Sequence, residues 1–203
     1  MKKTAKKALQ DIAYIKKIMS DSERMVADKG THYILWGILV ALGQGLNYLF
    51  VELDERDIIL NSFPYIIATW AVLFTAGGIF SALHERGRSR TKGSTTFAER
   101  IVGSVWLGSC IAMIIVIFLS LSTKALDPFL IDPIIALLMG VSYFICSRLY
   151  VSRWMMFLSF GWWFGSIPMF LRPCKETFLV FGLMIVVLFL VPGIAFYLKH
   201  RDR

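Results

Sequence analysis

HYILWGILVALGQGLNYLFV, residues 32–51, is the stretch that decides the fold. It is almost wholly apolar and contains no Lys, Arg, Asp or Glu. A helix of this length crosses the hydrocarbon core of a bilayer, which is roughly 30 Å thick. Five further apolar stretches follow, at about 64–83, 101–121, 129–147, 154–171 and 177–198. The sequence therefore predicts an all-α polytopic membrane protein, with a six-helix transmembrane bundle over residues 31–198.

The composition excludes an ordinary soluble domain. The chain has 203 residues, of which 57% are hydrophobic, and its mean hydropathy is +0.64. A soluble domain of this size has no core large enough to hide so much apolar surface. The net charge of +8 lies almost entirely between the apolar stretches. We attribute it to membrane topology and to contact with anionic lipid headgroups, and we expect no nucleic-acid partner.

The distribution of basic residues predicts the orientation. If the N-terminus is cytoplasmic, the segments on the inner side hold 18 of the 22 Lys and Arg residues. The outer side then holds only Arg56, Lys124, Arg172 and Lys175. An excess of basic residues marks the cytoplasmic side of a membrane protein. We therefore expect a multi-pass protein of the inner (plasma) membrane with both termini in the cytoplasm, and a basic cytoplasmic tail at 199–203.

Residues 1–30 are predicted to form a basic, amphipathic helix next to the first span. Leu9, Ile12, Ile15 and Met19 recur at helical spacing, and lysines supply the opposite face. Three roles stay open for this helix. In the first, the helix lies in the headgroup layer with its apolar face toward the lipid. In the second, it is a solvated helix that only carries topogenic charge, and in the third it docks on a protein partner.

Small residues at four-residue spacing occur in almost every span. Transmembrane helices pack by close approach, so such residues mark the faces on which helices meet. The predicted helix-packing positions are Gly37, Ala41, Gly45, Gly108, Gly140, Gly161 and Gly165. In the second span the corresponding residues are Ala71, Thr75, Gly78 and Ala82. Because these patterns repeat along the chain, we expect a closely packed bundle.

Few polar side chains interrupt the spans. Gln44 and Asn47 lie in the first span, where they either make interhelical hydrogen bonds or line a ligand cavity. Asp132 lies near the outer boundary of the fourth span. An acidic residue within a membrane span suggests a proton or cation site, although Asp132-Pro133, like Asp127-Pro128, also fits the start of a helix.

Two adjacent tryptophans lie unusually deep in a predicted membrane span. Trp162 and Trp163 are predicted near the middle of the fifth span, whereas tryptophan generally prefers the membrane interface. They either line an apolar ligand pocket or fill a groove beside Gly161 and Gly165. Asn47, Gln44 and this pair are the candidate cavity residues.

The first outer loop carries a group of acidic residues, Glu52, Asp54, Glu55 and Asp57. Four carboxylates on one short segment suggest either a divalent-cation site or a solvated acidic loop. Metal ligands must converge on one point, and Arg56 lies among these residues. The solvated loop is therefore the preferred interpretation.

No pattern of catalytic residues is found. The spans have no Lys, Arg, Asp, Glu or His near their centres, and neither a Ser-His-Asp order nor His-Glu-x-x-His occurs. The three histidines, His32, His84 and His200, fall at the predicted inner ends of spans and suggest no cofactor. We therefore expect a non-enzymatic protein without a cofactor or a metal.

One resemblance rests on the segment DIAYIKKIMSDSERMVADKG, which is followed, after Thr31 and His32, by YILWGILVALG. The segment resembles a group of small bacterial inner-membrane proteins that share a D-I-x-x-I-K-x-x-M juxtamembrane helix and several spans. The likeness covers about the first forty residues and the number of spans. It implies a bacterial inner-membrane protein, no assigned activity and no catalytic residue.

The sequence thus favours an integral membrane scaffold, regulatory subunit or sensor that acts through a protein partner or as a homo-oligomer. A facilitator or channel for a small or apolar molecule is the alternative. Gln44, Asn47, Trp162 and Trp163 would then lie near its path.

Overall fold

A computed structural model describes residues 30–89, 97–149 and 152–201. Within these ranges six helices are long and apolar enough to cross a membrane, and there is no strand. The prediction of an all-α polytopic membrane protein with six spans is thus confirmed. The predicted N-terminal helix falls on residues that lie outside the described part of the chain, apart from Gly30, where the first span begins.

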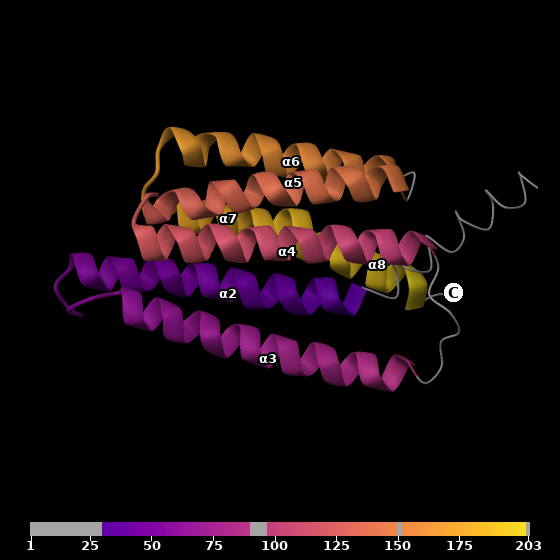
Figure 1. The fold of residues 1–203 in the computed structure, drawn as a ribbon, viewed down its shortest axis with the longest axis horizontal. Coiled ribbons are helices and arrows are strands. Elements are labelled where there is room, and N and C mark those ends of the chain that lie inside the picture. The colour runs from indigo at the N-terminus through magenta and orange to yellow at the C-terminus, as the bar shows by residue number, and fades with distance from the viewer. Residues whose placement is uncertain (1–29, 90–96, 150–151, 202–203) are drawn as a thin grey trace, which may run out of the picture.

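The spans run alternately up and down, side by side (Figure 1). Their bounds are α2 Gly30–Glu55, α3 Phe63–Ser89, α4 Phe97–Thr123, α5 Ile131–Leu149 and α6 Arg153–Leu171, and the last span consists of α7 Glu176–Ile185, η2 Val186–Leu190 and α8 Val191–Arg201. A short 3₁₀ turn, η1 Pro128–Leu130, precedes α5. The connections α2–α3, α4–α5 and α6–α7 share one end of the bundle, which we call the Lys175 end.

The closest pair of helices is α5 and α6. Gly140 of α5 lies directly against the indole of Trp163, and a Cβ added at this glycine would lie 2.2 Å from the indole nitrogen. That nitrogen donates a hydrogen bond to the carbonyl oxygen of Leu137, at 3.3 Å. A close backbone approach at a small residue is the usual way in which helices pack in lipid.

The last span packs mainly on α2 and to a smaller extent on α5 and α6. Close approaches again occur at glycines. Gly165 and Gly161 of α6 meet Met184 and Leu188, and Gly37 of α2 meets Leu190. Within this span η2 is a π-helical segment, in which the amide of Val191 bonds to the carbonyl of Val186. Pro192 follows it and has no amide proton to donate, so the normal α-helical ladder is interrupted here.

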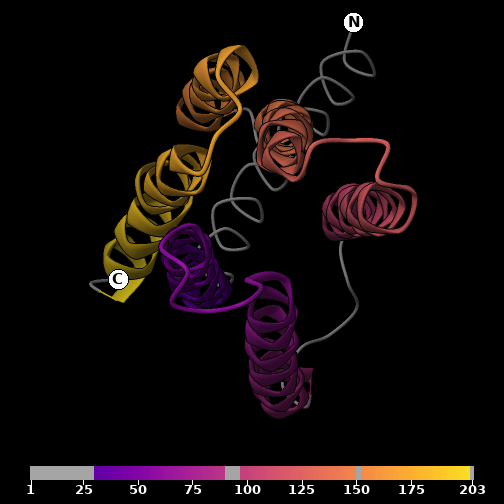
Figure 2. The ribbon, with the colours of Figure 1, turned by 90° about the vertical axis from the view of Figure 1, so that its left-hand side faces the viewer.

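The helices α3 and α4 lie at the periphery, as the view along the bundle shows (Figure 2). In an 18-residue apolar stretch of each of these two spans only 6% of the residues are buried, compared with 44% in the corresponding stretch of the span that contains α5. α3 packs mainly on α2, and α4 mainly on α5. One interhelical bond of α4 joins the hydroxyls of Ser109 and Ser142, 2.6 Å apart. The bundle is therefore less closely packed than the sequence predicted.

Two of the predicted helix-packing glycines do not pack within the described chain. A Cβ added at Gly45 or Gly108 would meet no described atom within 4 Å, so the helix contacts predicted for these two glycines are not made within the described chain. The same open surroundings are found at Gly78 on α3 and Gly103 on α4. The physical reason is that spans which are apolar on every side give no signal of which face meets a neighbour.

Gly140 provides a test of this packing. We expect Gly140→Leu to lower the stability of the protein in detergent by about 1–3 kcal/mol, because the new side chain must displace the Trp163 indole. Gly108→Leu, on a face open in the described chain, is the matched control and is expected to leave the stability of the isolated chain unchanged. Thermal unfolding of both variants measures the difference, and equal losses would contradict this packing.

Candidate functional site

A chain of hydrogen-bonded polar side chains joins three helices and is our candidate site. The indole nitrogen of Trp70 in α3 donates to Asn47 Oδ1 in α2 at 3.2 Å. Asn47 Nδ2 donates to Gln44 Oε1 over a longer distance of 3.5 Å. Gln44 Nε2 then donates to Asp132 Oδ1 in α5 at 3.1 Å. We call these residues the polar chain, and it contains three residues that the sequence pointed out separately.

The direction of these bonds is fixed by Trp70. An indole N–H can only donate, so Asn47 must present its oxygen to Trp70 and its amide hydrogens to Gln44. Gln44 in turn presents its oxygen to Asn47 and its own amide hydrogens to Asp132. The bonds therefore run in one direction, from α3 through α2 to α5, and end at the carboxyl group.

The polar chain is buried inside the bundle, away from lipid and water. Gln44, Asn47 and Asp132 are only 3%, 4% and 5% exposed. Within the described structure Asp132 Oδ2 is also buried and has no hydrogen-bond partner. A buried polar atom without a partner costs free energy, so this oxygen is the point at which the site is incomplete.

Two glycines make room for the polar chain. A Cβ at Gly182 of α7 would lie 3.3 Å from the Cβ of Gln44, so the absence of a side chain at Gly182 lets α7 lie close behind this glutamine. At Gly43 of α2 a Cβ would lie 2.8 Å from the ring of Trp70. Gly43 thus allows the indole to lie against α2, from which it reaches Asn47.

Asp132 does not serve as a helix cap. Its side chain bonds to Gln44 instead, and it is Asp127 that accepts a hydrogen bond from the amide of Phe129 and caps η1. The interpretation of Asp132 as a capping residue is therefore corrected. The reason is that η1 runs directly into α5, so Asp132 lies inside a turn that has already begun and its carboxyl group faces α2.

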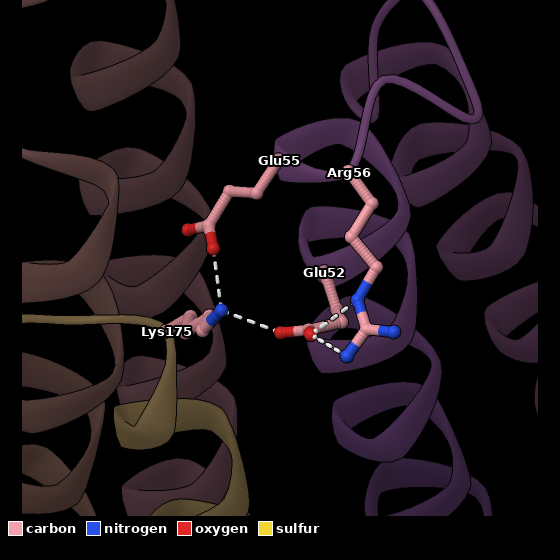
Figure 3. A network of polar contacts seen from close by, with 4 residues as sticks. All are labelled: Glu52, Glu55, Arg56 and Lys175. Carbon is pink, nitrogen blue, oxygen red and sulfur yellow. Dashed lines mark hydrogen bonds and ion pairs between the residues drawn. The ribbon is translucent and has the colours of Figure 1, made fainter.

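A second group of polar residues lies at the Lys175 end (Figure 3). Lys175 Nζ lies 2.5 Å from Glu52 Oε2 and also pairs with Glu55, and Arg56 Nε donates to Glu52 Oε1 at 2.7 Å. Both bonds, first that to Glu52 and then that to Glu55, raise the pKa of Lys175 above its usual range. The stabilisation of the folded chain by the charged Lys175 is therefore complete at neutral pH, and it is lost only as the pH rises through this raised pKa.

These ion pairs correct the interpretation of a solvated acidic loop. α2 continues through Glu55, so three of the four acidic residues belong to its last turn. Glu52 and Glu55 hold the α6–α7 connection, and Asp54 Oδ2 accepts the amide of Ser62 at 2.8 Å. In the described ranges no group of His, Cys, Asp and Glu residues is arranged to hold a metal ion.

The tryptophan pair divides between two environments. Trp162 is fully buried between Tyr143 and Phe181, with ring centroids 6.3 Å and 5.9 Å away. Trp163 points to the other side, against Gly140. The two indoles therefore do not line one common cavity. The groove beside Gly161 and Gly165 is filled by Leu188 and Met184, not by these rings.

The opposite end of the bundle has a pocket of about 280 Å³, between the end of α5 and the start of α6. It is lined by Ser147, Arg148, Ser152, Arg153 and Met156. Ser152 caps α6 by accepting a hydrogen bond from the amide of Met155. Two arginines beside a helix N-terminus form an electropositive surface. At the same end of the bundle the His32 and His84 rings are 5.5 Å apart, and the side chain of His200 is not described.

The sequence did not point to Trp70 or to the pairing role of Lys175. Trp70 lies in an apolar span, where an indole is usually read as a packing residue, and only its reach to Asn47 gives it a polar role. Lys175 was counted for topology alone. Both residues find their partners in other helices, so local patterns give no signal of these contacts.

Comparison of the chain with protein-family models, with curated proteins and with solved structures gave no match.

The Gln44–Asp132 bond can be tested by replacing one partner and then both. We expect Gln44→Leu to destabilise the protein by about 1–3 kcal/mol, because it leaves the buried carboxyl group without a donor. The double variant with Asp132→Leu should recover most of this loss, since both polar groups are then gone. Thermal unfolding in detergent measures both changes, and a double variant that is less stable than either single variant would argue against this pairing.

Proposed function

We propose that this chain is a bacterial inner-membrane protein without catalytic activity, and that it acts as a scaffold, regulatory or sensory subunit through a partner docked on α3 and α4. One observation carries the proposal. The small residues Gly78 on α3 and Gly108 on α4 face open space in the described structure, although such residues are typical of helix contacts.

The surroundings of these glycines support the same proposal. α3 and α4 each rest mainly on one neighbouring helix, and Gly78 and Gly108 are exposed on them in the described structure. Large apolar side chains such as Leu107, Ile79 and Leu83 are exposed beside them. A partner helix that packs on Gly78 or Gly108 would gain close backbone contact without displacing any described side chain.

The orientation and the lipid contacts belong to the same proposal. We place both termini in the cytoplasm, and the Lys175 end outside, because the basic residues of the sequence are distributed in this way. The pocket flanked by Arg148 and Arg153 then faces the inner leaflet, where its charge suits an anionic lipid headgroup.

A facilitator for a small molecule is the second candidate, and the polar chain favours it. Gln44, Asn47 and Asp132 are buried polar groups within membrane spans, and such groups often mark the path of a substrate. The candidates differ in what accompanies the protein: a scaffold keeps a partner protein, whereas a facilitator binds a small molecule inside the bundle.

The orientation can be tested by cysteine labelling in a chain whose native cysteines have been replaced. Leu60→Cys lies at a fully exposed position at the Lys175 end, and Arg153→Cys at an exposed position at the opposite end. We expect an impermeant thiol reagent to label the first in whole cells, and the second only after the membrane is permeabilised. Labelling in the reverse order would overturn the proposed topology.

The docking role can be tested by purification from native membranes followed by native mass spectrometry. We expect a stoichiometric protein partner, and an approximately fivefold or greater loss of it in Gly108→Leu, because forcing a packed helix away costs about 1–3 kcal/mol. Ile114→Phe, about a third of a turn around α4 from Gly108, is the matched control and should retain the partner. A small molecule bound without any protein would favour the facilitator instead.

A further inference from the structure

We infer that Asp132 is a proton-binding site, in which the carboxyl group is held neutral with its proton on Oδ2. This inference does not depend on what packs on α3 and α4. It begins with the carboxyl group itself, which is buried, accepts one hydrogen bond at Oδ1 and has no described partner at Oδ2. A charged carboxylate cannot be stabilised in such surroundings by a single neutral amide.

The elements packed around Asp132 bring no described positive charge to it. Lys175, at the start of the last span, is paired with Glu52 and Glu55, and Arg56 is paired with Glu52. The remaining described ionisable groups on these elements are His32, Tyr33, Tyr48 and Asp54 on α2, Asp127 before η1, Tyr143, Cys146 and Arg148 on α5, Arg153 on α6, and Arg172, Cys174 and Glu176 around the α6–α7 connection. None of them makes a described contact with the Asp132 carboxyl group. A proton on Oδ2 would therefore provide the missing positive charge.

The polar chain also favours a proton over a metal ion. An alkali or alkaline-earth ion needs several oxygen ligands that converge on it. The amide oxygen of Gln44 is turned toward Asn47, and that of Asn47 is turned toward Trp70. Because the indole of Trp70 imposes this orientation, both amides present hydrogens in the direction of Asp132. The polar chain thus offers a cation only one carboxylate, whereas a proton needs no further ligand.

The position of Asp132 gives the bound proton a structural consequence. Asp132 joins α5 to Gln44 of α2, and Gln44 lies two helical turns from Glu52 at the Lys175 end. Loss of the proton would leave an unneutralised charge between α2 and α5. Protonation of Asp132 therefore stabilises the packing of these two helices.

The protonation state can be measured directly in the intact protein by infrared spectroscopy. The full chain, labelled with ¹³C at its aspartate carboxyl groups, is reconstituted in neutral-lipid vesicles near neutral pH. We expect one labelled band of a protonated carboxylic acid, which disappears in Asp132→Asn and persists in Asp127→Asn. Asp127 is the matched control, because it is exposed and asparagine also caps a helix start. A wild-type spectrum that shows only ionised carboxylates would overturn the inference, whether or not the variants fold.

Stability as a function of pH gives a second measurement. If the folded protein holds a proton that the unfolded chain has released, its stability falls as the pH rises. Between about pH 5 and about pH 8, the melting temperature of the wild type should therefore fall relative to that of Asp132→Asn. The corresponding difference for Asp127→Asn should not shift in this way. A melting temperature that sodium raises in wild type but not in Asp132→Asn would show a metal-ion site and overturn the proposal.

Discussion

The hydrogen bond from Gln44 to Asp132 joins the two halves of the bundle. α2 carries α3 on its outer side, and α5 carries α4, so this bond links two pairs of helices. An interhelical hydrogen bond in a membrane contributes only about 0.6 kcal/mol on average. Its importance lies in the cost of the alternative, because separation of α2 from α5 would leave an amide and a carboxyl group without partners in an apolar environment. The last span packs on both α2 and α5 and so lies across the same junction.

The last span shows how the apolar core adapts to that link. Gly182 lets α7 approach Gln44 from behind, and Gly37 of α2 meets Leu190 further along the same span. Between these contacts, η2 adds the extra residue of a π-helical turn before Pro192. Such a turn shifts the register of the side chains that follow it. The span can therefore follow α2 on one side while Met184 and Leu188 still fill the groove beside Gly165 and Gly161 of α6.

The sequence predicted the number and type of the spans because length and hydropathy are local properties. It placed the end of the first span near Val51, and the helix extends to Glu55, since the acidic residues of its last turn are paired with Lys175 and Arg56 rather than solvated. Gln44, Asn47 and Asp132 stood out as polar residues in apolar spans. Their connection could not be predicted, because 88 residues separate Gln44 from Asp132 and the indole that orients them lies in a third helix.

The half of α2 nearer the Lys175 end therefore has an unusual distribution of side chains. Gln44 and Asn47 face the interior and Glu52 pairs with Lys175, whereas Leu42 and Leu49 are exposed. In a soluble protein this helix would be arranged the other way round, with leucine inside and glutamine outside. A polar face toward the interior costs free energy unless each group finds a partner there. In the polar chain that condition is met by every group that the bonds connect and fails only at Asp132 Oδ2. The donors of the polar chain end at Oδ1 of the same carboxyl group, so the oxygen without a partner belongs to the last residue of the polar chain.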